Sequence, residues 1–339
     1  MSPPSHPVVV DVHGHTLDLA FHVGRPLGAP LGGTTDVPLM RQGGVTAQLN
    51  ASWTPSASLS GPHSHSVADP PASLSAMLDF LEAELAGTAG EAVLVARRAA
   101  DLETAAATGR IAMILGMEGT DAIRGNPAAL EPLHRRGLRH ICLIHEHANE
   151  FGASSQVWEG GAMRRYRPGF DPEGHLSGRG RELLAEIGRL GLLIDLTHLV
   201  EPAFWEVLEV VSGPVIVSHG GARALTDSAR YLSDEQIRAV AETGGVIGAS
   251  PSPLGPSDEA PGLGMLFDTV DHLVAVGGAE HVAIGTDFKD QLGYYPEPLP
   301  DIGAFGAIGG GLAARGHSPA AIAGILGTNF VRLFQLIVG

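Results

Sequence analysis

The chain has 339 residues, of which 44% are hydrophobic and 17% are charged, with 46 glycines and 24 prolines. This length supports a large core, in one big domain or two ordinary ones, and excludes a small fold held together by disulfides. Acidic residues outnumber lysine and arginine by 37 to 21, so the formal net charge of −16 argues against a nucleic-acid partner.

The N-terminal stretch MSPPSHPVVVDVHGH has neither the basic start nor the apolar core of a signal peptide. No continuous apolar run approaches the roughly 20 residues that cross a membrane. We therefore expect a soluble, cytoplasmic protein with no membrane partner. The single cysteine, Cys142, lies inside an apolar run and is predicted to be a buried thiol.

Eight short apolar or β-branched runs are bounded by glycine or proline, which is typical of strands buried on both faces. These predicted strands span 8–15, 44–53, 110–119, 138–146, 191–198, 214–220, 244–251 and 281–288. Segments with helical spacing and glycine stop signals separate them. Two predicted helices lie within 72–109, and the others span 127–136, 179–190, 201–211, 233–242, 265–276 and 318–337. Ser233 and Gln236 have the spacing of a capping box.

Eight strands, each followed by helical material, predict a closed (β/α)8 barrel, or TIM barrel, in a single domain over residues 1–339. An open doubly wound sheet is the alternative, but no predicted strand is followed by a phosphate-binding glycine loop. The stretches 51–71 and 150–178 are predicted to be long loops over the barrel mouth. Neither has the composition of an interdomain linker.

Six of the eight predicted strands end in a side chain suited to metal binding or acid–base chemistry. The active site of a TIM barrel lies at the C-terminal ends of its strands, so these side chains are expected to meet at one rim. They are Asp11, His13 and His15 on the first strand, Glu118 on the third, His145 on the fourth, His198 on the fifth, His219 on the sixth and Asp287 on the eighth.

The spacing of His13 and His15 places both rings on one face of the first strand, where they can reach one metal. Glu118 is the candidate bridge to a second metal, because a single lysine among 21 basic residues leaves little room for a carboxylated-lysine bridge. His198 and His219, on adjacent strands, would bind the second metal. Imidazole and carboxylate ligands favour zinc, followed by manganese, iron or cobalt.

The chain resembles the renal or membrane dipeptidase family, within the metal-dependent amidohydrolase superfamily. The resembling segments follow the family's order between residues 8 and 335: DVHGH, GRIAMILGMEG, RGLRHICLIHEHAN, LSGRGRELLAEIGRLGLLIDLTHLVEPAFWEVLEVVSGPVIVSHGGARAL, SARYLSDEQ, VAIGTDF and GTNFVRLF. The resemblance implies a zinc-dependent dipeptidase that hydrolyses the amide bond of dipeptides or dipeptide-like small molecules with a metal-activated water.

The resemblance implies roles for individual residues. His13, Glu118, His198 and His219 match the family's metal ligands. Asp287 matches its catalytic acid and base, His145 its substrate-contacting histidine, and Arg230 in SARYLSDEQ its carboxylate-binding arginine. Two zinc ions per chain are expected. Asn50 ends the second predicted strand and is a candidate substrate contact, with a packing role equally open.

Two departures from the family pattern concern the metals and the pocket. His15 stands where the family's H-x-D motif has aspartate, which gives H-x-H. The exchange removes one negative charge, so one metal is expected to bind more weakly, and a site with one zinc is an alternative. The loop HEHANEFGASS lacks the family's usual tryptophan, which leaves the dipeptide preference open.

Three classes of function follow. The first is a dipeptidase acting on a small substrate with a free carboxylate. The second is another amidohydrolase-superfamily enzyme, acting on a lactone, a cyclic amide or a modified natural product. The third is a catalytically silent barrel that binds a ligand, which the retained ligand set argues against. Since the family often forms dimers, a homodimer is compatible with the resemblance.

Other polar residues are weaker candidates. His63 and His65 have ligand spacing but lie in a polar stretch. Glu146 and His147 are candidates for lining the pocket, and Asp11 for orienting a ring or facing a neighbouring strand. The remaining histidines are expected at the surface or at helix ends; they are His6, His22, His134, His140, His175, His272, His281 and His317.

Overall fold

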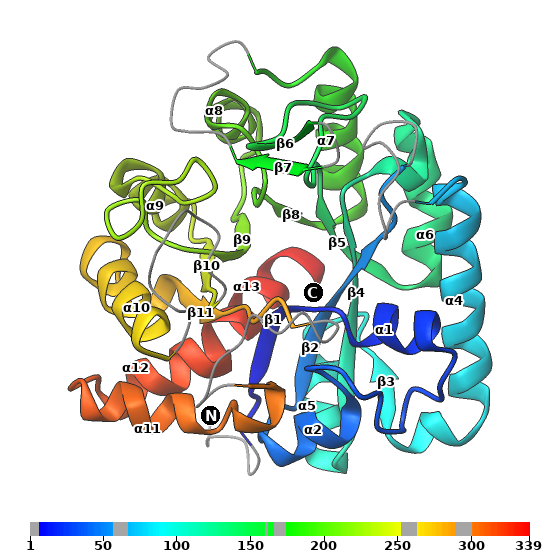
Figure 1. The fold of residues 1–339 in the computed structure, drawn as a ribbon, viewed down its shortest axis with the longest axis vertical. Helices are drawn as coiled ribbons and strands as arrows, with labels where there is room; N and C mark the ends of the chain where they lie inside the picture. The colour runs from blue at the N-terminus through cyan, green and yellow to red at the C-terminus, as the bar shows by residue number, and fades with distance from the viewer. Residues whose placement is uncertain (1–6, 57–66, 160–161, 166–173, 252–262, 289–299) are drawn as a thin grey trace.

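The computed structural model describes residues 7–56, 67–159, 162–165, 174–251, 263–288 and 300–339 (Figure 1). Parallel strands within these ranges form one sheet. They are β1 (Val10–Gly14), β2 (Ala47–Trp53), β3 (Val93–Val95), β4 (Ile111–Glu118), β5 (Leu138–Cys142), β8 (Leu193–Asp195), β9 (Ile216–Gly220), β10 (Val246–Ala249) and β11 (Val282–Ile284).

The sheet closes on itself. Its order is β2, β1, β11, β10, β9, β8, β5, β4, and β4 also pairs with β2 from Ala47 opposite Ala112 to Trp53 opposite Glu118. Eight parallel strands therefore form a closed barrel, which confirms the predicted TIM barrel. Every predicted strand overlaps one of these eight, because apolar runs buried on both faces are what the wall of such a barrel requires.

Helices surround the barrel (Figure 1). They are α1 (Thr16–Val23), α2 (Val37–Gln42), α4 (Pro70–Ala86), α5 (Ala99–Thr108), α6 (Leu130–Arg136), α7 (Gly178–Leu190), α8 (Glu201–Val210), α9 (Asp234–Glu242), α10 (Leu263–Gly277), α11 (Ala307–Ala314), α12 (Pro319–Ala323) and α13 (Asn329–Val338), with single-turn segments η1 (Thr88–Glu91), η2 (Asp121–Ile123), η3 (Pro127–Ala129), η4 (Ala279–His281), η5 (Ile302–Ala304) and η6 (Gly324–Thr328). The predicted capping box is confirmed at α9, where Ser233 and Gln236 cap each other's backbone N–H.

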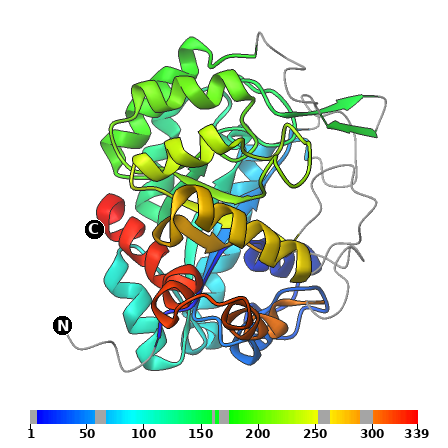
Figure 2. The ribbon, with the colours of Figure 1, turned by 90° about the vertical axis from the view of Figure 1, so that its left-hand side faces the viewer.

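Several segments differ from the prediction. The helices α1, α2 and α11 lie where no helix is predicted, and the helix predicted over 318–337 is divided into α12, η6 and α13. The region predicted to hold only two helices, 72–109, also contains β3, which pairs with the first residues of β4 outside the barrel ring. The segment 150–178, predicted to be a loop, contains the antiparallel hairpin β6 (Gln156–Glu159) and β7 (Ala162–Arg165). Figure 2 shows this hairpin at the end of the barrel opposite α13. The other predicted loop, 51–71, includes the end of β2 and the start of α4, and its His63 and His65 lie outside the described residues.

The C-terminal helices close the other end of the barrel. The stretch Pro319–Val338 is long and apolar enough, by length and composition, to cross a membrane, although 39% of that window is buried. Phe330, Leu333 and Phe334 are fully buried against strand residues such as Val10 and Ile216. The apolar face of α13 therefore belongs to the core of the barrel.

Two glycines, Gly248 in β10 and Gly285 directly after β11, lie close to the backbone of Ser218 in β9. A Cβ atom added at Gly248 or at Gly285 would overlap the carbonyl oxygen of Ser218. Because that oxygen belongs to the backbone, it cannot move aside as the end of a flexible side chain could. The two glycines therefore fix the backbone of β9 at Ser218.

The substitution Gly248→Ala is expected to reduce the free energy of unfolding by about 1–3 kcal/mol, since overpacking forces backbone shifts of that cost. Urea unfolding followed by circular dichroism measures the change. The matched control is Gly188→Ala in α7, where an added Cβ would contact nothing within 4 Å. It should raise the unfolding free energy by roughly 0.5–1 kcal/mol. Equal stability of the Gly248→Ala and wild-type proteins would contradict the proposed close approach.

Candidate metal centre

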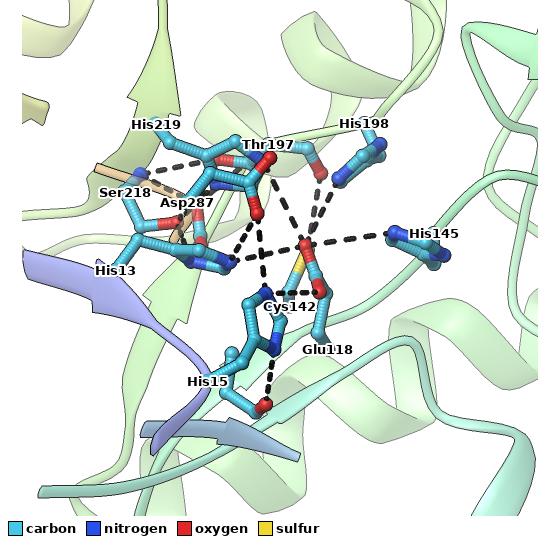
Figure 3. A network of polar contacts seen from close by, with 12 residues as sticks. His13, His15, Glu118, Cys142, His145, Thr197, His198, Ser218, His219 and Asp287 are labelled. Carbon is cyan, nitrogen blue, oxygen red and sulfur yellow. Dashed lines mark hydrogen bonds and ion pairs between the residues drawn. The ribbon is translucent and has the colours of Figure 1, made fainter. Parts of the chain in front are cut away.

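Glu118, the last residue of β4, lies at the centre of a ring of histidines at the C-terminal ends of the strands (Figure 3). Five imidazole Nε2 atoms face its carboxylate, and all six side chains are buried. The distances from Nε2 to the nearer carboxylate oxygen are 3.1 Å for His198, 3.3 Å for His13, and 3.7 Å for His15, His145 and His219. The structure thus brings together residues as far apart in the sequence as His13 and His219.

Asp287 follows β11 and completes the ring on the side of His13 and His15. Its Oδ1 lies 3.2 Å from His15 Nε2 and 3.9 Å from His13 Nε2. The Asp287 side chain is 15% exposed, more than the side chain of Glu118, at 2%. Asp287 is therefore the carboxylate of this site that an entering molecule and its water can reach.

Three overlapping groups of side chains have ligand atoms close enough to share a cation. They are His13, His15 and Asp287; His13, Glu118 and His219; and Glu118, His145 and His198. Glu118 belongs to two of the groups, as expected for a bridging carboxylate. His145, predicted as a substrate contact, also lies within reach of a ligand role.

The contacts of His15 show why a cation suits the site. Its Nδ1 lies 2.9 Å from the carbonyl oxygen of Ala51, which can only accept, so Nδ1 carries the hydrogen. In a neutral ring, Nε2 then presents a lone pair to Asp287 Oδ1 at 3.2 Å. Two facing lone pairs repel each other unless a positive charge lies between them. Likewise His13 Nε2 is buried and has no hydrogen-bond partner among the described side chains.

The protonation states of other side chains in the ring also favour a bound cation. Burial alone would raise the pKa of Glu118, but the neighbouring His145 and His13 hold it well below its usual value. Burial lowers the pKa of His198 to about 4, with a further contribution from nearby Arg230. Burial also lowers the pKa of His219 well below its usual value. An ionised Glu118 beside neutral His198 and His219 is a state that can bind zinc.

Two residues of the ring have backbone conformations that favour glycine. His198 has φ of 69° and Asp287 has φ of 57°. The left-handed region costs a residue with a Cβ about 1–2 kcal/mol. Backbone strain of this kind is characteristic of functional sites, where surrounding contacts enforce it. In this conformation the His198 side chain contacts Glu118, and the Asp287 side chain contacts His15.

Arg230, in the segment between β9 and α9, reaches the edge of the ring. Its Nη2 lies 3.4 Å from His198 Nε2 and 3.3 Å from the carbonyl oxygen of His219. The side chain is buried, and burial lowers the pKa of its guanidinium from the usual value. A buried cation beside the ring is suited to bind an anionic group of a ligand.

Asn50 makes contacts within the chain. Its Oδ1 accepts from the backbone N–H of Leu17, 2.9 Å away, and its Nδ2 donates to the carbonyl oxygen of Gln48, 3.1 Å away. The amide thus joins the first turn of α1 to β2, in agreement with the packing role. A substrate contact by Asn50 stays a prediction, as do the pocket-lining roles of Glu146 and His147.

His140 was predicted at the surface, and this is wrong: it is fully buried in β5, with Nε2 2.9 Å from Asp195 Oδ2. Its position in the middle of an apolar run was the signal that could have indicated this. Asp11 is also buried and accepts hydrogen bonds from Thr286 and Gln48, so it joins β1 to both neighbours. Burial raises the pKa of Asp11 to about 6.

Trp53, at the end of β2, packs against His145 with ring centroids 4.9 Å apart in an edge arrangement. The sequence motifs gave no sign of this contact, because the residues come from different strands. A tryptophan therefore does border the ring, although none occurs in the loop after β5 where the family's usual one was expected.

The model of the membrane dipeptidase family, peptidase family M19, matches residues 6–337. Dipeptidase aclJ of Aspergillus oryzae is 30% identical over 228 residues, which are 66% of this chain and 51% of that protein. Dipeptidase tcpJ of Claviceps purpurea is 28% identical over 247 residues, 71% of this chain and 54% of that protein. The chain thus matches about half the length of these relatives.

Solved structures share the fold over nearly the whole chain. The dipeptidase AC, a metallopeptidase of family M19, superposes with a TM-score of 0.85 at 25% identity, covering 99% of this chain and 100% of that one. A metallopeptidase of Rhodobacter sphaeroides, solved with a phosphinate mimic of the dipeptide L-Ala-D-Ala, gives 0.83 at 24% identity, with coverage of 98% and 100%.

Proposed function

The chain belongs to the membrane dipeptidase family, and from that premise we propose that it hydrolyses the amide bond of dipeptides or dipeptide-like small molecules with a free carboxylate. One observation carries the proposal: five imidazole Nε2 atoms converge on the Glu118 carboxylate, with Asp287 beside them. This donor set is that of a hydrolytic metal centre.

The residues fit zinc, and we assign two ions per chain. His13 and His15 would hold one ion and His198 and His219 the other, with Glu118 between them. Bound zinc lowers the pKa of water and polarises a carbonyl group. Because His15 contributes no negative charge, the ion that it contacts would be the weaker one, and a chain holding one zinc is the alternative.

The chain's own residues would carry the proton transfers and orient the substrate. Asp287 Oδ1 would accept a proton from the attacking water and pass it to the leaving amine nitrogen. His145 would donate a hydrogen bond to the developing oxyanion of the substrate. Arg230 would bind the substrate's free carboxylate through two parallel N–H donors. A cytoplasmic location and a homodimer stay predictions from the sequence.

A panel of small substrates tests the proposal. It comprises L,L- and L,D-dipeptides, the same dipeptides with a C-terminal amide, and a simple lactone. We expect turnover of dipeptides that is lost on metal chelation and restored by zinc. Amidated dipeptides should show roughly 10- to 100-fold lower kcat/KM, because a hydrogen bond to a charged group is worth about 1.5–3 kcal/mol. Turnover of the lactone alone, or turnover unaffected by chelation, would contradict the proposed activity.

A further inference from the structure

Ser218, in β9, lies between two histidines of the metal centre, on the side away from Glu118 (Figure 3). Its hydroxyl oxygen is 2.9 Å from His13 Nδ1 and 3.1 Å from His219 Nδ1. Ser218 and both rings are buried, so water does not compete for these contacts. One hydroxyl therefore contacts the outer nitrogen of two rings whose inner nitrogens face the Glu118 carboxylate.

The hydrogens around Ser218 can be assigned from its neighbours. Thr197 Oγ1 lies 2.6 Å from Asp195 Oδ1 and donates its hydrogen there. Burial alone would raise the pKa of Asp195, but hydrogen bonds from His140, Ser218 and Thr197 outweigh burial and hold that pKa below its usual value. The ionised Asp195 is an acceptor only, so Thr197 Oγ1 faces Ser218 as an acceptor.

The Ser218 hydroxyl hydrogen therefore has an acceptor in Thr197 Oγ1, 3.4 Å away. The two lone pairs of Ser218 Oγ are then available to accept from the Nδ1–H groups of both rings. In that arrangement, the Nε2 lone pairs of His13 and His219 both face Glu118. If Ser218 instead donated to one ring, that ring would carry its hydrogen on Nε2 and could not bind a metal there.

The backbone at Ser218 is held as firmly as the hydroxyl. Its N–H lies 3.0 Å from Asp195 Oδ1 and 3.0 Å from Thr197 Oγ1. Asp195 is in turn held by His140 Nε2 at 2.9 Å. On the other side, the close approach of Gly248 and Gly285 leaves the Ser218 carbonyl no room to shift. The buried pair of His140 and Asp195 therefore helps to hold the backbone of Ser218 in place.

We propose that Ser218 is a positioning residue that sets the tautomers of two metal ligands at once. By accepting from both Nδ1–H groups, it directs the Nε2 lone pairs of His13 and His219 to the metal centre. The inference rests on the proposed function in taking both rings as ligands. His15 does not depend on Ser218, because the carbonyl oxygen of Ala51 sets its tautomer.

Nitrogen NMR of the metal-free wild-type protein, labelled with ¹⁵N-histidine, tests the assignment directly. At about pH 8, above the ordinary histidine pKa of about 6.5, both rings should be Nδ1–H tautomers. The substitutions His13→Gln and His219→Gln identify the two sets of signals. An Nε2–H tautomer in either ring would overturn the proposal, and this measurement requires no substitution at Ser218.

The substitution Ser218→Ala tests the consequence for metal binding. We expect mixed tautomers for His13 and His219, an unchanged His15, and zinc dissociation constants raised about 10- to 100-fold, as for other residues that support metal ligands. Competition with a chromophoric chelator gives the constants. The matched control is Ser177→Ala, which also removes a hydroxyl with two hydrogen bonds, at the start of α7, and should leave zinc affinity unchanged.

The outcomes separate this inference from the proposed activity. Wild-type zinc affinity and tautomers in a folded Ser218→Ala protein would overturn the role of Ser218, whatever the protein hydrolyses. Conversely, the expected tautomers and affinities together with no dipeptide turnover would refute the activity and support the positioning role. If Ser218→Ala does not fold, the tautomers of the wild-type protein decide.

Discussion

Glu118→Gln is expected to abolish zinc retention and to lower kcat/KM for dipeptides by about 10³-fold or more, because water without a metal keeps a pKa near 15.7 instead of about 7. The physical reason is local. Five imidazole nitrogens face this carboxylate, and glutamine removes its negative charge and turns an amide N–H₂ group toward one or more of them. Elemental analysis after gel filtration and steady-state kinetics measure the two losses.

The control for Glu118→Gln is Glu201→Gln at the start of α8, where the carboxylate pairs with Arg223 and is partly exposed. That variant should keep its zinc and its turnover. Circular dichroism and urea unfolding establish that Glu118→Gln itself is folded. A folded Glu118→Gln protein with full zinc content and wild-type kinetics would refute the assignment of the metal centre.

Asp287→Asn is expected to lower kcat by about 10²- to 10⁴-fold, the usual contribution of a general acid–base group. Asparagine has nearly the shape of aspartate but cannot accept a proton. The rate dependence on pH should also lose the acidic limb that reports ionisation of the base. Because Asp287 is more accessible than Glu118, for which we propose the bridging role, zinc content should change far less than in Glu118→Gln.

Asp268→Asn provides the comparison for Asp287→Asn, since Asp268 is an exposed carboxylate that pairs with Arg315 on the outer helices. It should leave kcat unchanged. If Asp287→Asn lost zinc as completely as Glu118→Gln, Asp287 would be a metal ligand rather than a proton acceptor. If the Asp287→Asn protein kept both its zinc and the wild-type kcat, Asp287 would have no role in the reaction.

The barrel could be predicted because burial on both faces marks its strands in the local sequence. Glycine or proline bounded each apolar run, and all eight runs became wall strands. β3 could not be found in this way, since it is only three residues long and half-buried at Leu94 and Val95. It forms a strand because it pairs with β4, and the residues of β3 by themselves do not indicate this pairing.

The ring of candidate ligands could be predicted for a different reason. In a closed parallel barrel, strand ends that are distant in the sequence meet at one rim. The residue type at the end of each strand is therefore enough to predict which side chains meet there. The supporting residues lack such a rule. Ser218 contacts His13 across 205 positions, and His140 contacts Asp195 across 55 positions. A buried hydroxyl or imidazole can be recognised as a supporting residue only once its hydrogen-bond partner is known.

The contact between His15 and the carbonyl oxygen of Ala51 also restricts how the first-strand motif could change. An aspartate at residue 15, which the resemblance to the family leads us to expect there, would have no hydrogen to donate to that oxygen and would present it with a negative charge instead. The single exchange His15→Asp is therefore expected to disturb the end of β2 as well as the candidate metal centre. This hydrogen bond links residue 15 to the backbone of β2, so we expect an exchange at residue 15 to be tolerated best together with a change near Ala51.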